Sequence, residues 1–203
     1  MSHVSTSTAR AAPPKYNVTL LPEALQARDV LNLGCGAKKL ASAINVDSVA
    51  EVDPDLVIDL DQRPWPLPDD HFREVHAYDV LEHLTNVIGT LEELHRICRA
   101  GAIIHITVPH FSSANAFTDP THKHYFGHQS FHYVTGEHVH GHYSAARFRR
   151  IHTKIMFHPS MTNKIVHRLA NARPAAYEER WAWMFPAWYI HAELEVLKGS
   201  SAT

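Results

Sequence analysis

A glycine turn at the end of a short apolar run is the feature that most constrains this chain. Val30 to Leu33 has strand character and leads directly into Gly34, Cys35 and Gly36. Glycines at such a turn accept positive dihedral angles and let a ligand approach the backbone. Asp47 ends the next apolar run, thirteen residues after Gly34, where a carboxylate could accept both hydroxyls of a ribose. This order predicts a nucleoside-binding edge on a parallel sheet.

Short apolar runs continue to alternate with helical or polar segments along the chain. This pattern is typical of a mostly parallel sheet flanked by helices. The expected strands are residues 30–33, 44–46, 56–58, 74–78, 102–108, 146–157 and 189–198.

One helix is expected between the fourth and fifth strands. Its apolar face is marked by spacings of four, three and four between Val87, Leu91, Leu94 and Cys98. Thr85 or Asn86 could cap this helix, and Gly101 could end it.

The second half of the chain has a different character. Nine of the 18 histidines lie between His105 and His142. Residues 111–145, here called the histidine-rich segment, are too long for an ordinary connection and are expected to form a lid over an acceptor site. Residues 161–186 are expected to form a helical insertion that is interrupted at Pro174.

The composition argues against several classes of partner. The 19 Lys and Arg residues are balanced by 21 Asp and Glu residues, and the net charge of -2 gives no basic field for nucleic acid or an anionic membrane. The sequence contains no run of about 18 apolar residues and no secretory signal pattern at its start. Cys35 and Cys98 do not make a disulfide framework, so a cytoplasmic protein is expected.

Several further stretches occur in a characteristic order with the glycine turn. They are Asn45-Val46-Asp47, Asp59-Leu60, Trp65-Pro66-Leu67-Pro68-Asp69-Asp70-His71-Phe72, Asp79-Val80-Leu81-Glu82-His83-Leu84 and Glu93-Leu94-His95-Arg96-Ile97-Cys98-Arg99-Ala100-Gly101. As a set, they resemble the class I S-adenosylmethionine-dependent methyltransferases, in a small bacterial branch with a Leu-Glu-His-Leu signature. The resemblance covers residues 29–109 closely.

The resemblance implies a fold and a cofactor. The fold is a Rossmann-like α/β domain with a seven-stranded, mostly parallel sheet and an antiparallel last strand. It is expected over residues 16–198, because residues 1–15 and 199–203 have the small, polar composition of flexible ends. The cofactor is S-adenosylmethionine. The residues that the resemblance assigns to it are Gly34, Cys35 and Gly36 for the methionine and ribose portions, Asp47 for the ribose hydroxyls, Asp59 and Leu60 for the adenine edge, and Asp79 and Val80 beside the donor at the end of strand four.

The chain departs from this family at two turns. Arg99-Ala100-Gly101-Ala102 replaces the usual Lys-Pro-Gly-Gly before strand five. Only residues 37–43 separate the glycine turn from the second strand, which is too few for a full crossover helix. We therefore expect a short first helix and a donor site that is more open on that side.

The acceptor is expected over the carboxyl ends of the strands. The candidates include His110, which follows strand five, and Asp79, Glu82 and His83, which follow strand four; His83 fits a scaffold role better. Asp119-Pro120-Thr121-His122, followed by Ser130-Phe131, is similar to an Asp-Pro-Thr-His stretch of some bacterial members of the branch. The catalytic candidates are therefore His110, Asp119, His122 and His124.

Three interpretations of the histidine-rich segment remain open. In the first, Asp119 orients His122, which takes a proton from the acceptor. In the second, Asp119, His122 and His124 hold a divalent transition metal, with His110 or His128 as further ligands. In the third, the histidines are ordinary polar residues of a lid or surface. The surface interpretation is favoured for the alternating His138, His140 and His142.

The aromatic residues near the end of the chain suggest packing or association. Trp181, Trp183 and Trp188 are expected to lie on a buried helix or in a contact of a homodimer. Mixed flanking charges argue against membrane attachment.

The expected function is methyl transfer from S-adenosylmethionine to an oxygen or nitrogen of a small molecule, in specialised metabolism or sugar tailoring. Two alternatives stay open. One is a metal-dependent enzyme with a His/Asp site on a methyltransferase fold. The other is a non-catalytic nucleotide-binding partner subunit.

Overall fold

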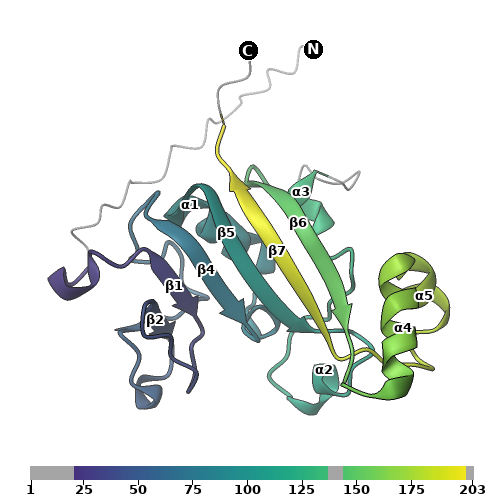
Figure 1. Cartoon of the computed structure of the whole chain (residues 1–203). Coiled ribbons are helices and arrows are strands. Elements are labelled where there is room, and N and C mark those ends of the chain that lie inside the picture. The colour runs from purple at the N-terminus through teal and green to yellow at the C-terminus, as the bar shows by residue number, and fades with distance from the viewer. Residues whose placement is uncertain (1–20, 137–143, 200–203) are drawn as a thin grey trace, which may run out of the picture.

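The computed structural model describes residues 21–136 and 144–199, and within them seven strands form one sheet in the order β3-β2-β1-β4-β5-β7-β6 (Figure 1). The strands are β1 (Val30–Leu33), β2 (Ile44–Asp47), β3 (Leu56–Val57), β4 (Phe72–Tyr78), β5 (Cys98–Pro109), β6 (Arg147–Met156) and β7 (Tyr189–Leu197). The last strand, β7, runs antiparallel to both β5 and β6, whereas the pairs from β3 through β5 are parallel. The predicted seven-stranded α/β sheet is confirmed.

The connection from β1 to β2 contains turns and no helix, so the expected short first helix is wrong. Two buried asparagines organise this connection instead. Asn32 Nδ2 donates hydrogen bonds to the Lys38 carbonyl and to Asn45 Oδ1, both at 2.9 Å, and the Leu40 amide donates to the same Asn45 oxygen at 2.8 Å. Side-chain amides thereby satisfy backbone groups that a helix would satisfy internally.

The helix predicted between the fourth and fifth strands is α1 (Val87–Ile97). Asn86 is its cap, since Asn86 Oδ1 accepts a hydrogen bond from the Gly89 amide at 2.8 Å. The helix ends at Ile97 and Cys98 already belongs to β5, so the prediction that Gly101 ends it is wrong. Gly101 instead adopts φ of 77° within the irregular start of β5, where the register shifts between Phe72 and Glu74.

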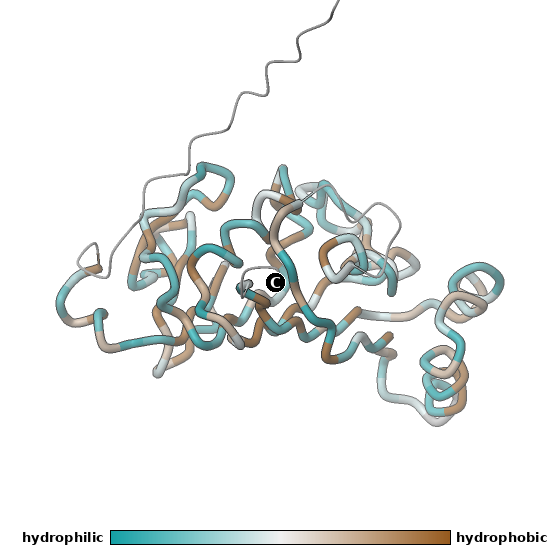
Figure 2. The backbone as a smooth tube through the Cα atoms, turned by 90° about the horizontal axis from the view of Figure 1, so that it is seen from above, coloured by the Kyte–Doolittle hydropathy of each residue, from teal (hydrophilic) through white to brown (hydrophobic). Residues whose placement is uncertain are grey.

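The helices cover the sheet unevenly. Both α1 and the short α3 (His132–Thr135) lie on one face of the sheet (Figures 1 and 2). No α-helix of the described residues lies over the opposite face of β4, β5, β7 and β6, which is called the open face below. The remaining short elements are α2 (Asn115–Thr118) and the 3-10 turns η2 (Glu23–Leu25), η3 (Ala50–Val52) and η4 (Leu81–His83).

The helical segment predicted after the sixth strand consists of α4 (Met161–Ala172) and α5 (Pro174–Arg180), with the expected break before Pro174. Both helices lie beyond the β6 edge of the sheet (Figures 1 and 2). They enclose a small second core that contains Ile155, Phe157, Ala170, Tyr177, Ala182 and Ala187. Among the described residues, no helix has the length and apolar character to cross a bilayer.

The prediction that the tryptophans lie on a buried helix is wrong, because Trp181, Trp183 and Trp188 all lie outside the helices. Trp181 and Trp183 follow α5 in turns and are 49% and 70% exposed. Trp188 is partly buried and stacks on His158, with 3.9 Å between the ring centroids. The subunit contact stays a prediction.

Arg96 fastens the segment before β4 to α1. Its guanidinium pairs with Asp69 and Glu93 and donates to the carbonyls of Trp65 and Leu67, each at 2.9 Å. The Arg96 side chain is only 12% exposed. Its removal would leave buried carboxylates and carbonyls without their donor.

We expect Arg96→Ala to lower the free energy of unfolding by about 3–5 kcal/mol, because breaking a buried ion pair leaves its partner uncompensated. The control is Arg149→Ala, which removes an exposed pair with Glu195 and should cost under about 1 kcal/mol. Urea denaturation followed by circular dichroism measures both. Equal losses in the two variants would contradict the role of Arg96.

Candidate active site

The glycine turn and Asp47 are held together by hydrogen bonds. Gly34 and Gly36 adopt φ of 64° and 48°. The Gly36 amide donates to Asp47 Oδ2 at 2.8 Å, and the Val49 amide donates to Asp47 Oδ1 at 3.0 Å. The carboxylate is therefore fixed at the end of β2, directly beside the turn, with lone pairs left for further donors.

The two glycines have different surroundings. A Cβ atom on Gly34 would lie 2.5 Å from Val80 Cγ2, so the turn packs directly on the residues after β4. A Cβ atom on Gly36 would meet nothing within 4 Å, so the space above this residue is open. Burial, and secondarily the nearby Asp47 charge, raise the pKa of Cys35, which keeps this buried side chain an uncharged thiol.

The other predicted cofactor residues end neighbouring strands. Asp59 is exposed just after β3, and its Oδ1 accepts the Asp61 amide at 3.0 Å. The Leu60 side chain is buried in the core, so only its backbone can face a ligand. Asp79 adopts φ of 56° after β4 and accepts the Thr107 hydroxyl at 3.2 Å. Carboxylates and an open turn at one sheet edge fit a ligand with hydroxyls, an amine and a positive charge.

A pocket of about 540 Å³ adjoins these residues at the carboxyl ends of β4 and β5. It is called the Glu82 pocket below. Its polar lining includes Asp79, Glu82, His83, Asn115, Asp119 and His122.

Glu82 has the most unusual environment in this pocket. It is 1% exposed, and neither carboxyl oxygen has a hydrogen-bond partner among the described residues. His122 lies beside this carboxyl group, with Nε2 4.0 Å from Glu82 Oε1. Burial, followed by the charges of Asp79 and Asp119, raises the pKa of Glu82 to about 8. Near neutral pH this carboxyl group therefore holds its proton.

Two histidines lie beside Glu82. The rings of His83 and His122 meet edge to face, with 4.6 Å between their centroids. His122 Nδ1 lies 3.2 Å from the Ala116 carbonyl. Because a carbonyl only accepts, Nδ1 carries a proton, and in neutral His122 the Nε2 lone pair then faces Glu82. Burial and the neighbouring His122 lower the pKa of His83.

The predicted trio of Asp119, His122 and His124 is not brought together. Asp119 Oδ1 accepts the Thr121 amide and hydroxyl, at 2.8 and 2.7 Å, so its carboxylate does not orient His122. His124 Nε2 lies 3.4 Å from the Thr85 carbonyl, and His124 does not line the pocket. In this pocket, the residues whose possible ligand atoms all lie within 4.8 Å of one another are instead Glu82, His83 and His122.

The expectation that His110 faces the cleft is wrong. Its side chain is fully buried, with Nδ1 2.8 Å from the Ser112 hydroxyl and Nε2 3.2 Å from Glu178 Oε1. Although burial opposes it, hydrogen bonds from His110 and the His128 amide lower the pKa of Glu178. His110 therefore connects β5 to α5, and Pro109 forms the pocket wall at this point.

The pocket also contains residues that were not singled out from the sequence. Asn115 Nδ2 donates to the Tyr189 hydroxyl at 3.3 Å, and both residues line the pocket. Tyr189 reaches this position because it begins β7 and pairs with Pro109 at the end of β5. The alternating His138, His140 and His142 lie outside the described residues.

The comparisons with known proteins agree with this geometry. A family model described as a methyltransferase domain matches residues 8–154, which is more than half of the chain. The chain therefore belongs to the methyltransferase domain family. A search of curated proteins found no match.

Solved structures share the fold at low sequence identity. An S-adenosylmethionine-dependent methyltransferase from Archaeoglobus fulgidus has a TM-score of 0.59 and 17% identity, covering 83% of this chain and 86% of that chain. One from Mesorhizobium loti has a TM-score of 0.52 and 15% identity, covering 87% and 94%. The [4+2]-cyclase SpnF has a TM-score of 0.51 and 14% identity, covering 84% and 74%.

The buried Glu82 carboxyl group predicts a pH-dependent stability. The folded state holds this proton up to about pH 8, whereas the unfolded state releases it near 4.5, so folding stability falls as pH rises between these values. From pH 6 to 9, we expect the Glu82 contribution to lower the free energy of unfolding by roughly 3 kcal/mol. Glu82→Gln should remove this loss.

Urea denaturation at pH 6 and 9 measures this effect. The matched control is Glu51→Gln at an exposed site, which should keep the wild-type pH dependence. If Glu82→Gln shows the same dependence as wild type, the Glu82 carboxyl group is not held protonated by burial.

Proposed function

We propose that this chain transfers the methyl group of S-adenosylmethionine to an oxygen or nitrogen of a small polar molecule bound in the Glu82 pocket. The observation that carries the proposal is the buried Glu82 carboxyl group, without a hydrogen-bond partner among the described residues, that faces His122 beside the donor edge. A polar group left unsatisfied in a pocket is costly unless a ligand completes it.

The donor would lie along the edge formed by the glycine turn and the ends of β2, β3 and β4. Asp47 would accept its ribose hydroxyls, and Asp59 with the Leu60 backbone would bind the adenine edge. Gly34, Cys35 and Gly36 would border the methionine portion, with Asp79 and Val80 between donor and acceptor. When bound, S-adenosylmethionine supplies an electrophilic methyl group on a sulfonium.

Glu82 and His122 would manage the proton of the acceptor. A base with a pKa near 8 is better matched to a hydroxyl or amine than an ordinary carboxylate. The unprotonated His122 Nε2 would receive the Glu82 proton and leave the carboxylate free to accept one from the acceptor. Asp79, Asp119 and Asn115 would position the acceptor, because methyl transfer depends mainly on alignment.

The histidine-rich segment, residues 111–145, would form the acceptor side of the site. Its Lys123 and His124 amides both donate to the Glu82 carbonyl, at 2.7 and 3.3 Å, which attaches the segment to η4. We propose that it acts as a lid that excludes water. A role in specialised metabolism, a cytoplasmic location and a homodimer belong to the same proposal.

A metal-dependent reaction is the second candidate. Glu82, His83 and His122 bring one carboxylate and two imidazoles together, which is a ligand set that divalent transition metals accept. A zinc-dependent rate that is lost in His83→Ala would favour this candidate over proton transfer by Glu82 and His122.

Donor binding tests the first half of the proposal. Asp47→Ala should weaken binding of S-adenosylhomocysteine by roughly 10- to 100-fold, since hydrogen bonds to a charged group contribute about 1.5–3 kcal/mol. Isothermal titration calorimetry measures the affinity. Asp53→Ala is the control, because Asp53 is exposed and pairs with Lys39. Unchanged binding in Asp47→Ala would contradict the donor site.

Methyl transfer tests the second half. With methyl-labelled S-adenosylmethionine and a panel of phenols, polyols and amines, we expect wild type to label at least one acceptor. Its rate should rise with pH up to about 8, as Glu82 loses its proton. Glu82→Gln should lower this rate by about 10²- to 10⁴-fold and remove that pH dependence. Tight donor binding without transfer to any acceptor would instead favour a non-catalytic partner subunit.

A further inference from the structure

Histidine and glutamate side chains form a row across the open face of the sheet, away from the Glu82 pocket. His76 on β4 is paired in register with His105 on β5, and His105 is paired with Glu193 on β7. Glu193 is in turn paired with His152 on β6. Strand alternation puts these side chains on one face, opposite buried neighbours such as Val75 and Ile104. The row therefore results from sheet register alone.

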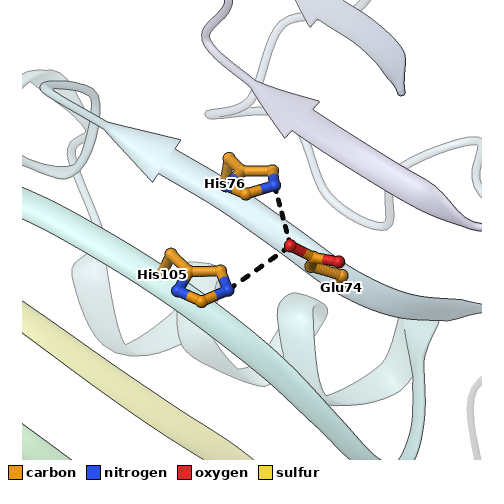
Figure 3. A group of neighbouring side chains, drawn as sticks. All are labelled: Glu74, His76 and His105. Atoms are coloured by element: carbon orange, nitrogen blue, oxygen red, sulfur yellow. Dashed lines mark ion pairs between the residues drawn. The ribbon is translucent and has the colours of Figure 1, made fainter. Parts of the chain in front are cut away.

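Glu74 completes a compact group at the β4 end of this row (Figure 3). Glu74 Oε1 lies 3.1 Å from His76 Nε2 and 3.5 Å from His105 Nε2. All three ligand atoms lie within 4.8 Å of one another. Two ligand atoms on a tetrahedral zinc, with bonds of about 2.0–2.1 Å, are separated by roughly 3.3 Å. The distances around Glu74 Oε1 are close to that value before any ion is added.

The other polar atoms of the same three side chains, Glu74 Oε2, His76 Nδ1 and His105 Nδ1, contact neighbouring side chains. Arg73 Nη1 donates to Glu74 Oε2 at 3.0 Å, and His76 Nδ1 lies 2.9 Å from the Tyr78 hydroxyl. His105 Nδ1 lies 3.1 Å from Glu193 Oε1. Such contacts fix the ring orientation and the tautomer of a ligating histidine, and the carboxylate behind His105 is a frequent arrangement in zinc sites.

His105 shows why an ion suits this group. Each of its two ring nitrogens faces a carboxylate, Glu193 on one side and Glu74 on the other. A neutral imidazole has one N–H and can donate to only one of them. If Nδ1–H donates to Glu193, the lone pair of Nε2 faces Glu74, and a cation between them converts a repulsive contact into two coordination bonds.

We propose that Glu74, His76 and His105 form a binding site for a divalent transition metal ion, with Zn²⁺ as the best match, on the open face of the sheet. Two imidazoles and one carboxylate give three protein ligands, and a water molecule would complete the tetrahedral set. Glu193 is a positioning residue that acts through His105. The ion would join β4 to β5.

A second set, His105, His191 and Glu193, also has its ligand atoms within 4.8 Å of one another. Both sets contain His105, but in the second set it is His105 Nδ1, facing Glu193, that would be the ligand atom. His191 Nε2 lies 3.9 Å from Glu193 Oε1, and His152 Nδ1 also contacts this glutamate, at 3.4 Å. Each set has one contact of 3.1 Å, but the other contact is 3.5 Å in the first set and 3.9 Å in the second. The proposal is therefore for the Glu74 side, and His191 supplies a control.

Zinc binding to untagged, chelator-treated protein tests the proposal. Isothermal titration calorimetry with ZnCl₂ and elemental analysis after dialysis should show one tight site per chain. His76→Ala and His105→Ala should each abolish this binding step. Glu193→Gln should weaken it by about 10- to 100-fold, as expected for a residue behind a ligating histidine. Glu74→Gln keeps the side-chain shape and should weaken the step at least 10-fold.

Three controls decide between this site and others. The binding step should persist in His191→Ala, and in His122→Ala, which disrupts the separate group of the Glu82 pocket. Zinc should also raise the melting temperature of wild type and His122→Ala but not that of His76→Ala. If His76→Ala binds zinc like wild type, or if His122→Ala or His191→Ala alone loses the step, the proposal is wrong. If the alanine variants do not fold, an unchanged zinc affinity in Glu74→Gln would also show that the proposal is wrong.

Discussion

The contact between the glycine turn and the residues after β4 is the constraint on which the site depends. Gly34 lies so close to Val80 that any side chain there would overlap it, and the Gly36 amide holds the Asp47 carboxylate. These contacts join the ends of β1, β2 and β4 into one edge. Because Val80 is followed directly by η4, the same packing also places Glu82 beside that edge. The proposed donor and acceptor sites are thus held by the same packing contact.

Burial of Glu82 gives this edge its chemistry. A carboxyl group on an exposed loop would be ionised at neutral pH and would serve only to attract cations. Enclosed by the histidine-rich segment and facing His122, Glu82 instead keeps its proton and has a pKa close to those suited to proton transfer. Burying this ionisable group costs folding free energy, and groups whose pKa is shifted by burial are common at functional sites.

The row of histidines and glutamates lies on a face of the sheet that no α-helix of the described residues covers. Asparagine side chains replace the helix between β1 and β2, and no α-helix among residues 21–136 and 144–199 covers the open face. A covered face would need apolar residues, as the side with α1 has. The open face instead carries a row of histidines and glutamates that lie beside one another across four strands.

The amino-acid sequence predicted the strands, the glycine turn with Asp47 after it and the helix between β4 and β5, because these depend on local periodicity and on motifs of fixed spacing. It left Thr85 and Asn86 both open as the cap of that helix. It did not determine which histidines meet. His110 follows strand five as expected, yet its ring turns into the core toward Glu178, and Asp119 binds Thr121 rather than His122. The pairing of His76 with His105, and of Pro109 with Tyr189, arises only when strands far apart in the chain align. Tertiary structure decided these contacts, since sheet register and burial depend on the whole chain and not on neighbouring residues.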